Sequence, residues 1–355
     1  MSSLVVKVTT IDEVHPHMNA DRLALVTIGG WQCVVLKDAY VPGQRVIFFP
    51  PDTVLAQEWT DRFGVTQYCQ ALKGSDEGRC RIRQTRLRGE PSFGLVIACD
   101  ELALDMPWDV DTDVAAYFGA TKYEPPVKAV AGDAVPDYPL FVRYTDIEDL
   151  RNFPTLFRAG ELVQATHKLH GTNSRAGVVG GELLAGSHGW RRQRPDEAGW
   201  ARNTYWFPLS LGPVRTMVEA LGALYHQVIL FGEVYGQGVQ KLDYGQRGLA
   251  YAAFDLVLDG RFVDAPTFGS LVDYYGVPRV PVADTWAWGV GLFPESDLKH
   301  VAGLASGKAH TGEHIREGVV LRPLVERTNP KVGRLILKYA SDAYRLGNHD
   351  VAGDH

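Results

Sequence analysis

Residues 166–175 read THKLHGTNSR, a lysine between two histidines followed by Gly-Thr-Asn, in a part of the chain that is mostly apolar and typical of a strand. If the strand continues to Thr172, the side chains of Lys168, His170 and Thr172 point to the same face. Gly171 leaves room for a ligand or another backbone to approach closely. A lysine that a strand holds in a cleft can have a lowered pKa and act as a nucleophile. The alternative is a surface lysine beside a turn.

The bulk composition indicates a globular protein with more than one domain. The chain has 355 residues, of which 45% are hydrophobic and 22% charged, and this length suits two domains. No stretch reaches the roughly 20 uncharged apolar residues of a membrane helix, and the first residues lack the basic head and apolar run of a signal peptide. We therefore expect a cytoplasmic protein that does not bind membranes.

Charge and cysteine content exclude some function classes. The net charge of -6 argues against a protein that coats nucleic acid nonspecifically, although a local basic patch is compatible with it. The 4 cysteines form no C-x-x-C pair. We interpret them as reduced packing residues rather than as zinc ligands or disulfides.

The first hundred residues predict short strands separated by Gly and Pro turns, which suits a small five-stranded barrel. Residues 15–35, HPHMNADRLALVTIGGWQCVV, resemble the opening of OB-fold modules that bind tRNA, and residues 86–97, RLRGEPSFGLVI, resemble a later strand pair of these modules. We therefore expect an OB-fold nucleic-acid-binding domain over residues 1–110.

A basic strip falls within this barrel. Arg79, Arg81 and Arg83 alternate, so on one strand their guanidinium groups would share a face. The neighbouring basic residues are Lys73, Arg86 and Arg88. The strip is either a solvated edge strand protected by charge or a surface that follows a phosphate backbone.

The composition changes after the barrel. Residues 111–140 are rich in Pro, Asp, Gly and Ala and predict a linker. Residues 141–355 mix strand patterns, such as VILFGEVYG, with helical patterns, such as GPVRTMVEALGALYHQ. This order predicts an α+β domain with antiparallel sheets.

Four further residues could form a site with Lys168. Glu233 lies in LFGEVYG, Phe254 in YAAFDLVLDG, Glu317 in REGVVLRPL and Lys338 in LILKYASDAY. Taken singly, each has an ordinary explanation: a loop carboxylate, a core aromatic or a lysine that reaches from the core to solvent.

Together and in this order, the segments resemble the motifs of the covalent nucleotidyltransferase superfamily, which includes ligases and mRNA capping enzymes. KLHGTN matches the Lys-x-His-Gly-Thr-Asn motif of ATP-dependent RNA ligases at every fixed position, and the likeness spans residues 141–345. The resemblance implies that Lys168 attacks the α-phosphorus of ATP, holds AMP and releases pyrophosphate. Glu233 would hold the ribose and Phe254 would stack on the adenine.

The same resemblance implies the rest of the site. Glu317 would help bind Mg²⁺ or Mn²⁺, Lys338 would neutralise the α-phosphate, and His170 would orient the pyrophosphate or its metal. The remaining nucleotide-binding positions are Thr166, Gly171, Asn173 and an arginine after the first motif, Arg191 or alternatively Arg192. The fifth motif departs from the family pattern, because Ala340 stands where a second lysine is usual.

Domain order narrows the expected reaction. The barrel precedes the nucleotidyltransferase domain, and only a short tail follows Ala340, an arrangement that looks like the Deinococcus-type RNA ligase. We therefore expect an enzyme that adenylylates a 5′-phosphate and seals it to a 3′-OH. The substrate would be nicked duplex RNA or an RNA/DNA hybrid with ribonucleotides on the 3′-OH side, and no protein partner is evident. The alternatives are a DNA ligase, a single-strand RNA ligase and a noncatalytic RNA-binding protein.

Overall fold

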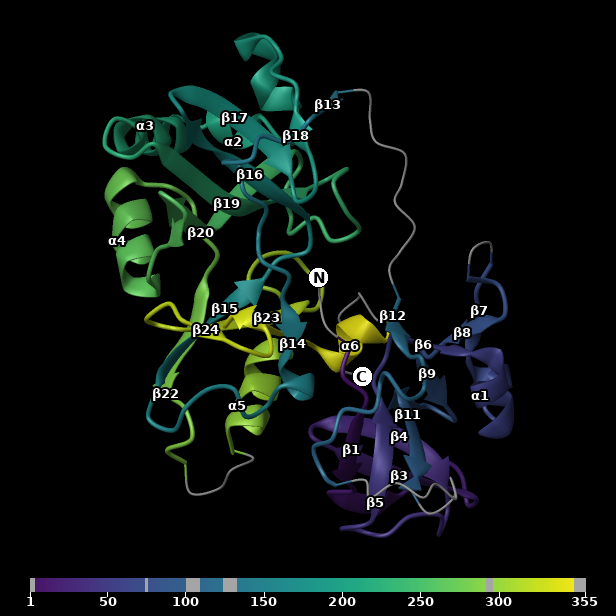
Figure 1. Cartoon of the computed structure of the whole chain (residues 1–355). Coiled ribbons are helices and arrows are strands. Elements are labelled where there is room, and N and C mark those ends of the chain that lie inside the picture. The colour runs from purple at the N-terminus through teal and green to yellow at the C-terminus, as the bar shows by residue number, and fades with distance from the viewer. Residues whose placement is uncertain (1–3, 74–75, 100–108, 124–132, 292–295, 348–355) are drawn as a thin grey trace. The chain divides into compact units, whose positions relative to one another are not determined.

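The computed structural model describes residues 4–73, 76–99, 109–123, 133–291 and 296–347 (Figure 1). The chain divides into two compact units, Met1–Pro126 with Leu150–Pro154, and Val127–Asp149 with Thr155–His355. Of the predicted linker, residues 124–132 lie outside the described residues. Within the described ranges, no helix is long and apolar enough to cross a membrane.

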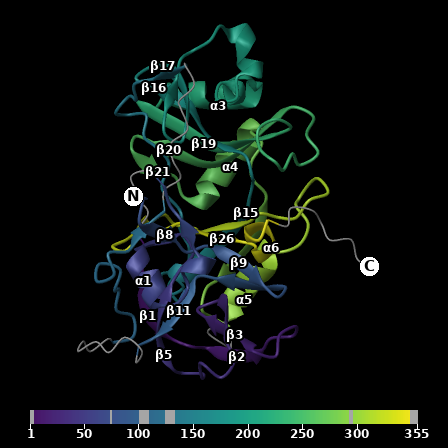
Figure 2. The ribbon, with the colours of Figure 1, turned by 90° about the vertical axis from the view of Figure 1, so that its right-hand side faces the viewer.

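The first unit is built from short antiparallel strands. Strands β1 (Lys7–Thr10), β5 (Arg45–Phe49) and β11 (Leu95–Ala98) form one sheet, with β5 in the middle; the three strands are labelled in Figure 2. Strands β2 (Glu13–Pro16), β3 (Leu23–Ile28) and β4 (Trp31–Leu36) form a second. The remaining elements are β6 (Thr53–Ala56), α1 (Gln57–Arg62), a 3₁₀ turn (Thr66–Tyr68), β7 (Gln70–Ala71), β8 (Arg79–Arg81), β9 (Gln84–Leu87), β10 (Glu90–Phe93), β12 (Thr121–Lys122) and a 3₁₀ turn (Leu150–Asn152).

Local sequence explains the clearest hairpin of this unit. Gly29 and Gly30 both have positive φ, +55° and +86°, and join β3 to β4 in a two-residue turn, as their position between two apolar runs predicts. The apolar core includes Val8, Phe49 and, from the stretch expected to be linker, Phe118. Residues 109–123 therefore pack with the first unit, because their apolar side chains complete its core.

Two large sheets make up most of the described part of the second unit. The seven-stranded sheet has the order β13 (Ala134–Val135), β18 (Arg191–Arg192), β17 (Glu182–Ser187), β16 (Thr172–Val179), β19 (Gln227–Gly236), β20 (Leu249–Leu258) and β21 (Arg261–Phe262). The five-stranded sheet has the order β14 (Glu148–Asp149), β26 (Leu337–Ala340), β23 (Gly318–Pro323), β15 (Leu162–Lys168) and β22 (Val282–Ala287). Every neighbouring pair in the two sheets is antiparallel except β14 with β26, so the predicted α+β class with antiparallel sheets is confirmed.

Helices cover these sheets. Helices α3 (Gly212–Gly222) and α4 (Ala265–Tyr275) pack on the seven-stranded sheet, and α5 (Ser296–Ala305) packs on β23 and β26 (Figure 1). The shorter elements are a 3₁₀ turn (Glu197–Arg202), α2 (Phe207–Ser210), the β24 (Thr328–Asn329) and β25 (Gly333–Arg334) hairpin, and α6 (Asp342–Arg345). The α3 sequence dictates its buried face, because Val214, Met217, Val218 and Leu221 are buried at helical spacing.

The expectation of one strand through the lysine motif is wrong. Strand β15 ends at Lys168, the chain turns, and Thr172 begins β16 in the other sheet. The turn forms because Leu169 is buried in an apolar cluster with Leu242 and because Gly171 lies directly against the backbone of β19. Lys168 therefore lies where the chain passes from one sheet to the other.

Candidate active site

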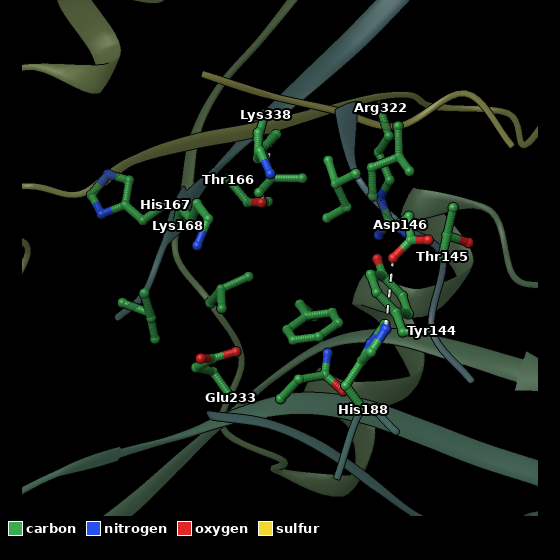
Figure 3. A pocket seen from close by; sticks show the side chains of 17 residues that line it. Tyr144, Thr145, Asp146, Thr166, His167, Lys168, His188, Glu233, Arg322 and Lys338 are labelled. Atoms are coloured by element: carbon green, nitrogen blue, oxygen red, sulfur yellow. Dashed lines mark hydrogen bonds and ion pairs between the residues drawn. The ribbon is translucent and has the colours of Figure 1, made fainter. Parts of the chain in front are cut away.

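A cavity of about 290 Å³ lies between the two sheets of the second unit, and Lys168 lies in its wall (Figure 3). The five-stranded sheet contributes Thr166, His167, Lys168, Val320, Arg322 and Lys338, and the seven-stranded sheet contributes Asn173, Glu233 and Phe254. Other lining residues include Tyr144, Thr145, Asp146, Ile147, Val280, His188 and Ile336. Residues distant in sequence therefore meet around one hollow of a size that suits part of a nucleotide.

The Lys168 amine is paired with a buried carboxylate. Its Nζ lies 2.5 Å from Oε1 of Glu317, whose side chain is 6% exposed. Burial would lower the pKa of Lys168, but Glu317 and Glu233 outweigh burial and hold that pKa above its ordinary value. Burial would likewise raise the pKa of Glu317, but Lys168 and His170 outweigh it and lower that pKa. In the protein without ligand the lysine pKa is therefore raised rather than lowered, chiefly because Glu317 pairs with the amine.

Glu233 faces the same hollow from the neighbouring sheet. Its position on β19 pairs with Asn173 on β16. Burial raises the pKa of Glu233 to about 8, against the opposing effect of Lys168 and with a further contribution from Glu317. At neutral pH this side chain is therefore protonated and can both donate and accept a hydrogen bond.

A break in strand pairing sets the position of Phe254. Gly232 pairs with Ala253 and Phe231 pairs with Asp255, so Phe254 is the extra residue of a β-bulge. Bulges commonly re-aim a side chain beside an active site. The Phe254 ring lines the cavity, as does Val320 from the opposite sheet. Two apolar side chains from facing sheets form a slot that suits a flat ring.

A buried ionic network supports this bulge. Asp255 is fully buried and accepts hydrogen bonds from the Tyr144 hydroxyl at 2.8 Å and from Arg322 at 2.9 Å. Arg334 approaches Oδ2 of Asp255, the oxygen that accepts from Tyr144, at 2.7 Å, and also pairs with Glu326. Because buried charges with several partners resist displacement, the network fixes β20 against β23 directly behind the cavity.

The remaining residues of the lysine motif have different positions. Thr166 and Asn173 line the cavity, whereas His170 is absent from the described part of its wall. The His170 backbone N–H donates to the Tyr244 hydroxyl at 2.7 Å, and its Nδ1 lies 2.9 Å from the Tyr344 hydroxyl. These contacts and Glu317, 3.4 Å from Nδ1, hold His170 behind Lys168.

Gly171 is required by backbone packing rather than by open space for a ligand. A Cβ there would lie 2.2 Å from the Val234 carbonyl oxygen and 3.0 Å from Cγ of Glu233. The close contact with β19 brings Lys168 and Glu233 to the same hollow. Of the two possibilities that the sequence left open, close approach of another backbone is the one observed.

The expected phosphate-binding arginine is displaced from the cavity. Arg191 donates from Nε to the Pro136 carbonyl at 3.0 Å, and Arg192 pairs with Asp133 at 2.7 Å. Neither belongs to the described residues that line the cavity, and both line a separate hollow. The reason is strand placement, because both lie on β18, one strand further from β16 than β17. Sequence reasoning missed His188, Asp146, Tyr144 and Arg322, which do line the cavity.

The basic strip of the first unit also differs from its expected form. Strand β8 ends at Arg81, so Arg83 lies beyond it, although the alternation persists with Cys80 and Ile82 buried between the arginines. Arg79 donates to the carbonyl oxygens of Val54 and Gly119, and Arg81 pairs with Asp52 at 2.5 Å. Two of the three guanidinium groups thus stabilise the unit itself.

The other basic residues of this region are more accessible. Lys73, Arg83, Arg86 and Arg88 are exposed. Arg86 donates to the Gly89 carbonyl at 2.8 Å within its own turn. Of the three alternating arginines, only Arg83 therefore joins these exposed basic side chains.

Comparison with known proteins identifies the family to which the chain belongs. A family model described as RNA ligase matches residues 161–340, half of the chain. The chain belongs to the RNA ligase family. A second model, described as an OB-fold domain, matches residues 5–99. The predictions of an RNA ligase and of an N-terminal OB-fold domain are therefore confirmed. Among curated proteins, no significant match is found.

Solved structures of similar architecture agree with this family. Naegleria gruberi RNA ligase with PPi has a TM-score of 0.72 and 23% identity over 96% of this chain and 98% of that one. A lysine-to-alanine mutant of that ligase with ATP and Mn has a TM-score of 0.72 and 24% identity over 97% and 99% of the two chains. A glutamate-to-alanine mutant with AMP and Mn has a TM-score of 0.74 and 23% identity over 98% and 99%. At these identities the comparison establishes a shared fold.

Proposed function

We propose that this RNA ligase family member is ATP-dependent and forms a lysyl-AMP intermediate on Lys168. The observation that carries the proposal is the gathering of Lys168, Glu233, Phe254 and Lys338 around one cavity. An amine nucleophile, a ribose-binding carboxyl, a ring for the base and a cation for the α-phosphate are the groups that adenylyl transfer needs. The similarity to ligase structures with ATP, AMP and Mn supports the same nucleotide and metal.

In the first step, the Lys168 Nζ attacks the α-phosphorus of ATP. A nitrogen–phosphorus bond forms, and the bond from that phosphorus to the oxygen of pyrophosphate breaks. Lys338 offsets the negative charge that builds on the α-phosphate. Attack requires a neutral amine, so the proton that pairing with Glu317 retains on Lys168 must leave first. Glu233 holds the ribose and Phe254 stacks on the adenine.

The residues present fit a divalent metal that is bound partly by substrate. The described residues contain no group of three or more His, Cys, Asp or Glu side chains placed to hold an ion. Mg²⁺ is commonly bound by one or two carboxylates together with phosphates and water, so such a group is unnecessary. Glu317 supplies a carboxylate, and the buried Asn173 Oδ1 has no hydrogen-bond partner within the described part of the chain. When bound, Mg²⁺ or Mn²⁺ supplies positive charge beside the phosphates and weakens the hold of Glu317 on the Lys168 proton.

The later steps join two strands. An oxygen of the RNA 5′-phosphate attacks the phosphorus of lysyl-AMP and releases the Lys168 amine. The RNA end then carries AMP through a pyrophosphate link, from which AMP is a good leaving group. The 3′-OH of the other strand then attacks that end and releases AMP. We propose that the substrate is a nick with ribonucleotides on the 3′-OH side, as the Deinococcus-type resemblance implies. Residues 1–110 would hold the duplex with exposed basic side chains, and residues 141–355 would perform the chemistry.

A sealing assay tests this proposal. A nicked duplex carries a labelled 5′-phosphate, and wild-type protein with ATP and Mg²⁺ should convert it to sealed product. Lys168→Ala should fail with this substrate but should seal a strand that already carries AMP, because only the first steps need the amine. Replacing the 3′-terminal ribonucleotide with a deoxynucleotide should slow sealing strongly. Equal sealing of ribonucleotide and deoxynucleotide 3′ ends would instead indicate a DNA ligase. Faster sealing of free strands than of nicked duplexes would indicate a single-strand RNA ligase.

A further inference from the structure

The segment after β17 presents one side chain to the cavity. Strand β17 ends at Ser187, whose backbone N–H donates to the Trp190 carbonyl at 2.8 Å and closes a tight turn. Residues 187–192 are all described, and His188 is the member of this segment that lines the cavity. Arg191 and Arg192, the expected nucleotide contacts, lie beyond the turn with their side chains bound elsewhere.

Strand pairing brings the end of β17 close to residues of the proposed nucleotide site. Glu233 on β19 pairs with Asn173 on β16, and the adjacent position Ser174 pairs with Ser187 on β17. His188 follows Ser187 directly, in the turn just beyond the end of β17. Glu233, Asn173 and His188 therefore come from two neighbouring strands and the turn that follows the third. All three line the cavity.

The Asp146 carboxylate lies beside the His188 imidazole. The His188 Nε2 lies 3.7 Å from the Asp146 carboxylate, and both side chains line the cavity on the side opposite Lys168 and Lys338 (Figure 3). Burial lowers the pKa of His188 against the opposing effect of Asp146, while Arg175 and Arg143 lower it further. Because Asp146 lies on the Nε2 side of the ring, the Nδ1 side can face a ligand.

The wall of the cavity contains a polar atom that lacks a partner. The Asn173 Oδ1 is buried and makes no hydrogen bond within the part of the chain that the structure describes. Such an atom is costly unless a ligand, ion or water satisfies it. This part of the cavity wall is therefore suited to a ligand hydroxyl group or a cation beside the Asn173 Oδ1.

We infer that His188, which lies beside Asp146, contacts the sugar–phosphate part of the nucleotide near Asn173, in the role that the family resemblance implied for Arg191 or alternatively Arg192. The inference rests on the proposed function, because the ligand is the ATP that reacts with Lys168. Asp146 is a positioning residue that acts through His188. A histidine at this point gives a directed hydrogen bond in place of the fixed charge of an arginine.

Nucleotide binding and lysine labelling test the inference. ATP affinity is measured by calorimetry on Lys168→Ala protein, which cannot react, with and without His188→Ala. Transfer of label from α-labelled ATP is measured on the protein with Lys168 intact over a range of ATP concentrations. His188→Ala should weaken binding and raise the KM about tenfold, the effect of losing one hydrogen bond to a polar ligand. The matched control Arg191→Ala should change either value less than twofold.

A double-mutant cycle tests the part of Asp146. Asp146→Asn should raise the KM when His188 is present and should add nothing in the His188→Ala background, because it acts through the imidazole. Repeating the binding with 2′-deoxy-ATP and 3′-deoxy-ATP identifies the oxygen. If the loss of affinity caused by His188→Ala disappears with one analogue, His188 contacts the sugar hydroxyl that this analogue lacks. If the loss persists with both analogues, His188 contacts a phosphate. Either result supports the contact.

The opposite pattern overturns the inference. If His188→Ala binds ATP like its parent while Arg191→Ala is impaired tenfold, the contact belongs to Arg191. Thermal melting of each variant shows whether the protein is folded. Failure of folded wild type to take up label would contradict the proposed function instead, so the two failures are distinguishable.

Discussion

Replacing Gly171 with alanine should separate folding from catalysis. The added Cβ would lie 2.2 Å from the Val234 carbonyl oxygen and 3.0 Å from atoms of Glu233 and Tyr235, so all of its near neighbours belong to β19. Reaching ordinary contact distance requires the turn and β19 to separate by about 1 Å. Because the turn carries Lys168 and β19 carries Glu233, this movement changes the geometry of the cavity directly.

The expected magnitudes follow from this clash. Overpacking of this kind costs about 1–3 kcal/mol of unfolding free energy, which lowers the Tm by about 2 to 10 °C in a protein of this size. A displacement of about 1 Å in a reacting group can reduce the rate about 100-fold. Lysyl-AMP formation should therefore fall about 100-fold at a temperature at which the variant is still folded. Label transfer from α-labelled ATP and thermal melting measure the two effects.

Two other glycines serve as controls. Gly177→Ala places a Cβ 1.9 Å from the Val228 carbonyl in the same strand pair but away from the cavity, whereas at Gly189 nothing lies within 4 Å. Gly177→Ala should lower the Tm as much as Gly171→Ala and keep most of the label transfer, and Gly189→Ala should change neither. A Gly171→Ala protein with wild-type Tm and activity, or one no less active than Gly177→Ala, would refute the reasoning.

Three further changes test separate parts of the structure. Phe254→Ala should raise the KM for ATP roughly tenfold with little change in kcat, because stacking on a base contributes about 1–3 kcal/mol. An unchanged KM would exclude stacking of the adenine on the Phe254 ring. Because burial raises the pKa of Glu233 to about 8, wild type loses stability as pH rises from about 4.5 to about 8 while the unfolded chain ionises. The Tm of Glu233→Gln minus the Tm of wild type should therefore increase over that pH range. A difference that stays constant would contradict the raised pKa of Glu233. Arg81→Ala should lower the Tm, because Arg81 pairs with Asp52. Arg83→Ala should leave the Tm unchanged and should reduce by about one the number of ions released when RNA binds. The reverse result would support the alternating arginines as the RNA-binding surface.

Periodicity and motif order predicted much of the fold and part of the site. The apolar spacing of α3 and the strand patterns of β19 and β20 are local properties, so they can be read directly from the sequence. The family resemblance selected Lys168, Glu233, Phe254 and Lys338, and the structure brings these four to one cavity. Their roles in catalysis remain proposals that the experiments above address.

The parts that sequence could not predict depend on contacts between distant residues. Nothing local distinguishes a strand through Thr172 from a turn after Lys168, because the turn is fixed by contact of Gly171 with β19. The choice among His188, Arg191 and Arg192 depends on where β17 ends and on its register with β16.

Electrostatic partners were equally beyond sequence reasoning. Lys168 keeps its proton because Glu317, far along the chain, lies 2.5 Å away. In the first unit, Arg81 is bound to Asp52, and the alternating pattern around it contains no sign of that partner. Residue type and spacing thus identified candidates, whereas tertiary contacts determined which of them face the cavity or solvent.

The most direct test of the mechanism is incubation of wild type, Lys168→Ala and Lys308→Ala with α-labelled ATP and Mg²⁺, followed by denaturation. Lys308 is a surface control, with a side chain 65% exposed. Label should remain on wild type and on Lys308→Ala, be absent from Lys168→Ala, and be released by acid, which cleaves a phosphoramide. Label on folded Lys168→Ala, or none on folded wild type that carries no bound AMP, would contradict a lysyl-AMP mechanism at Lys168.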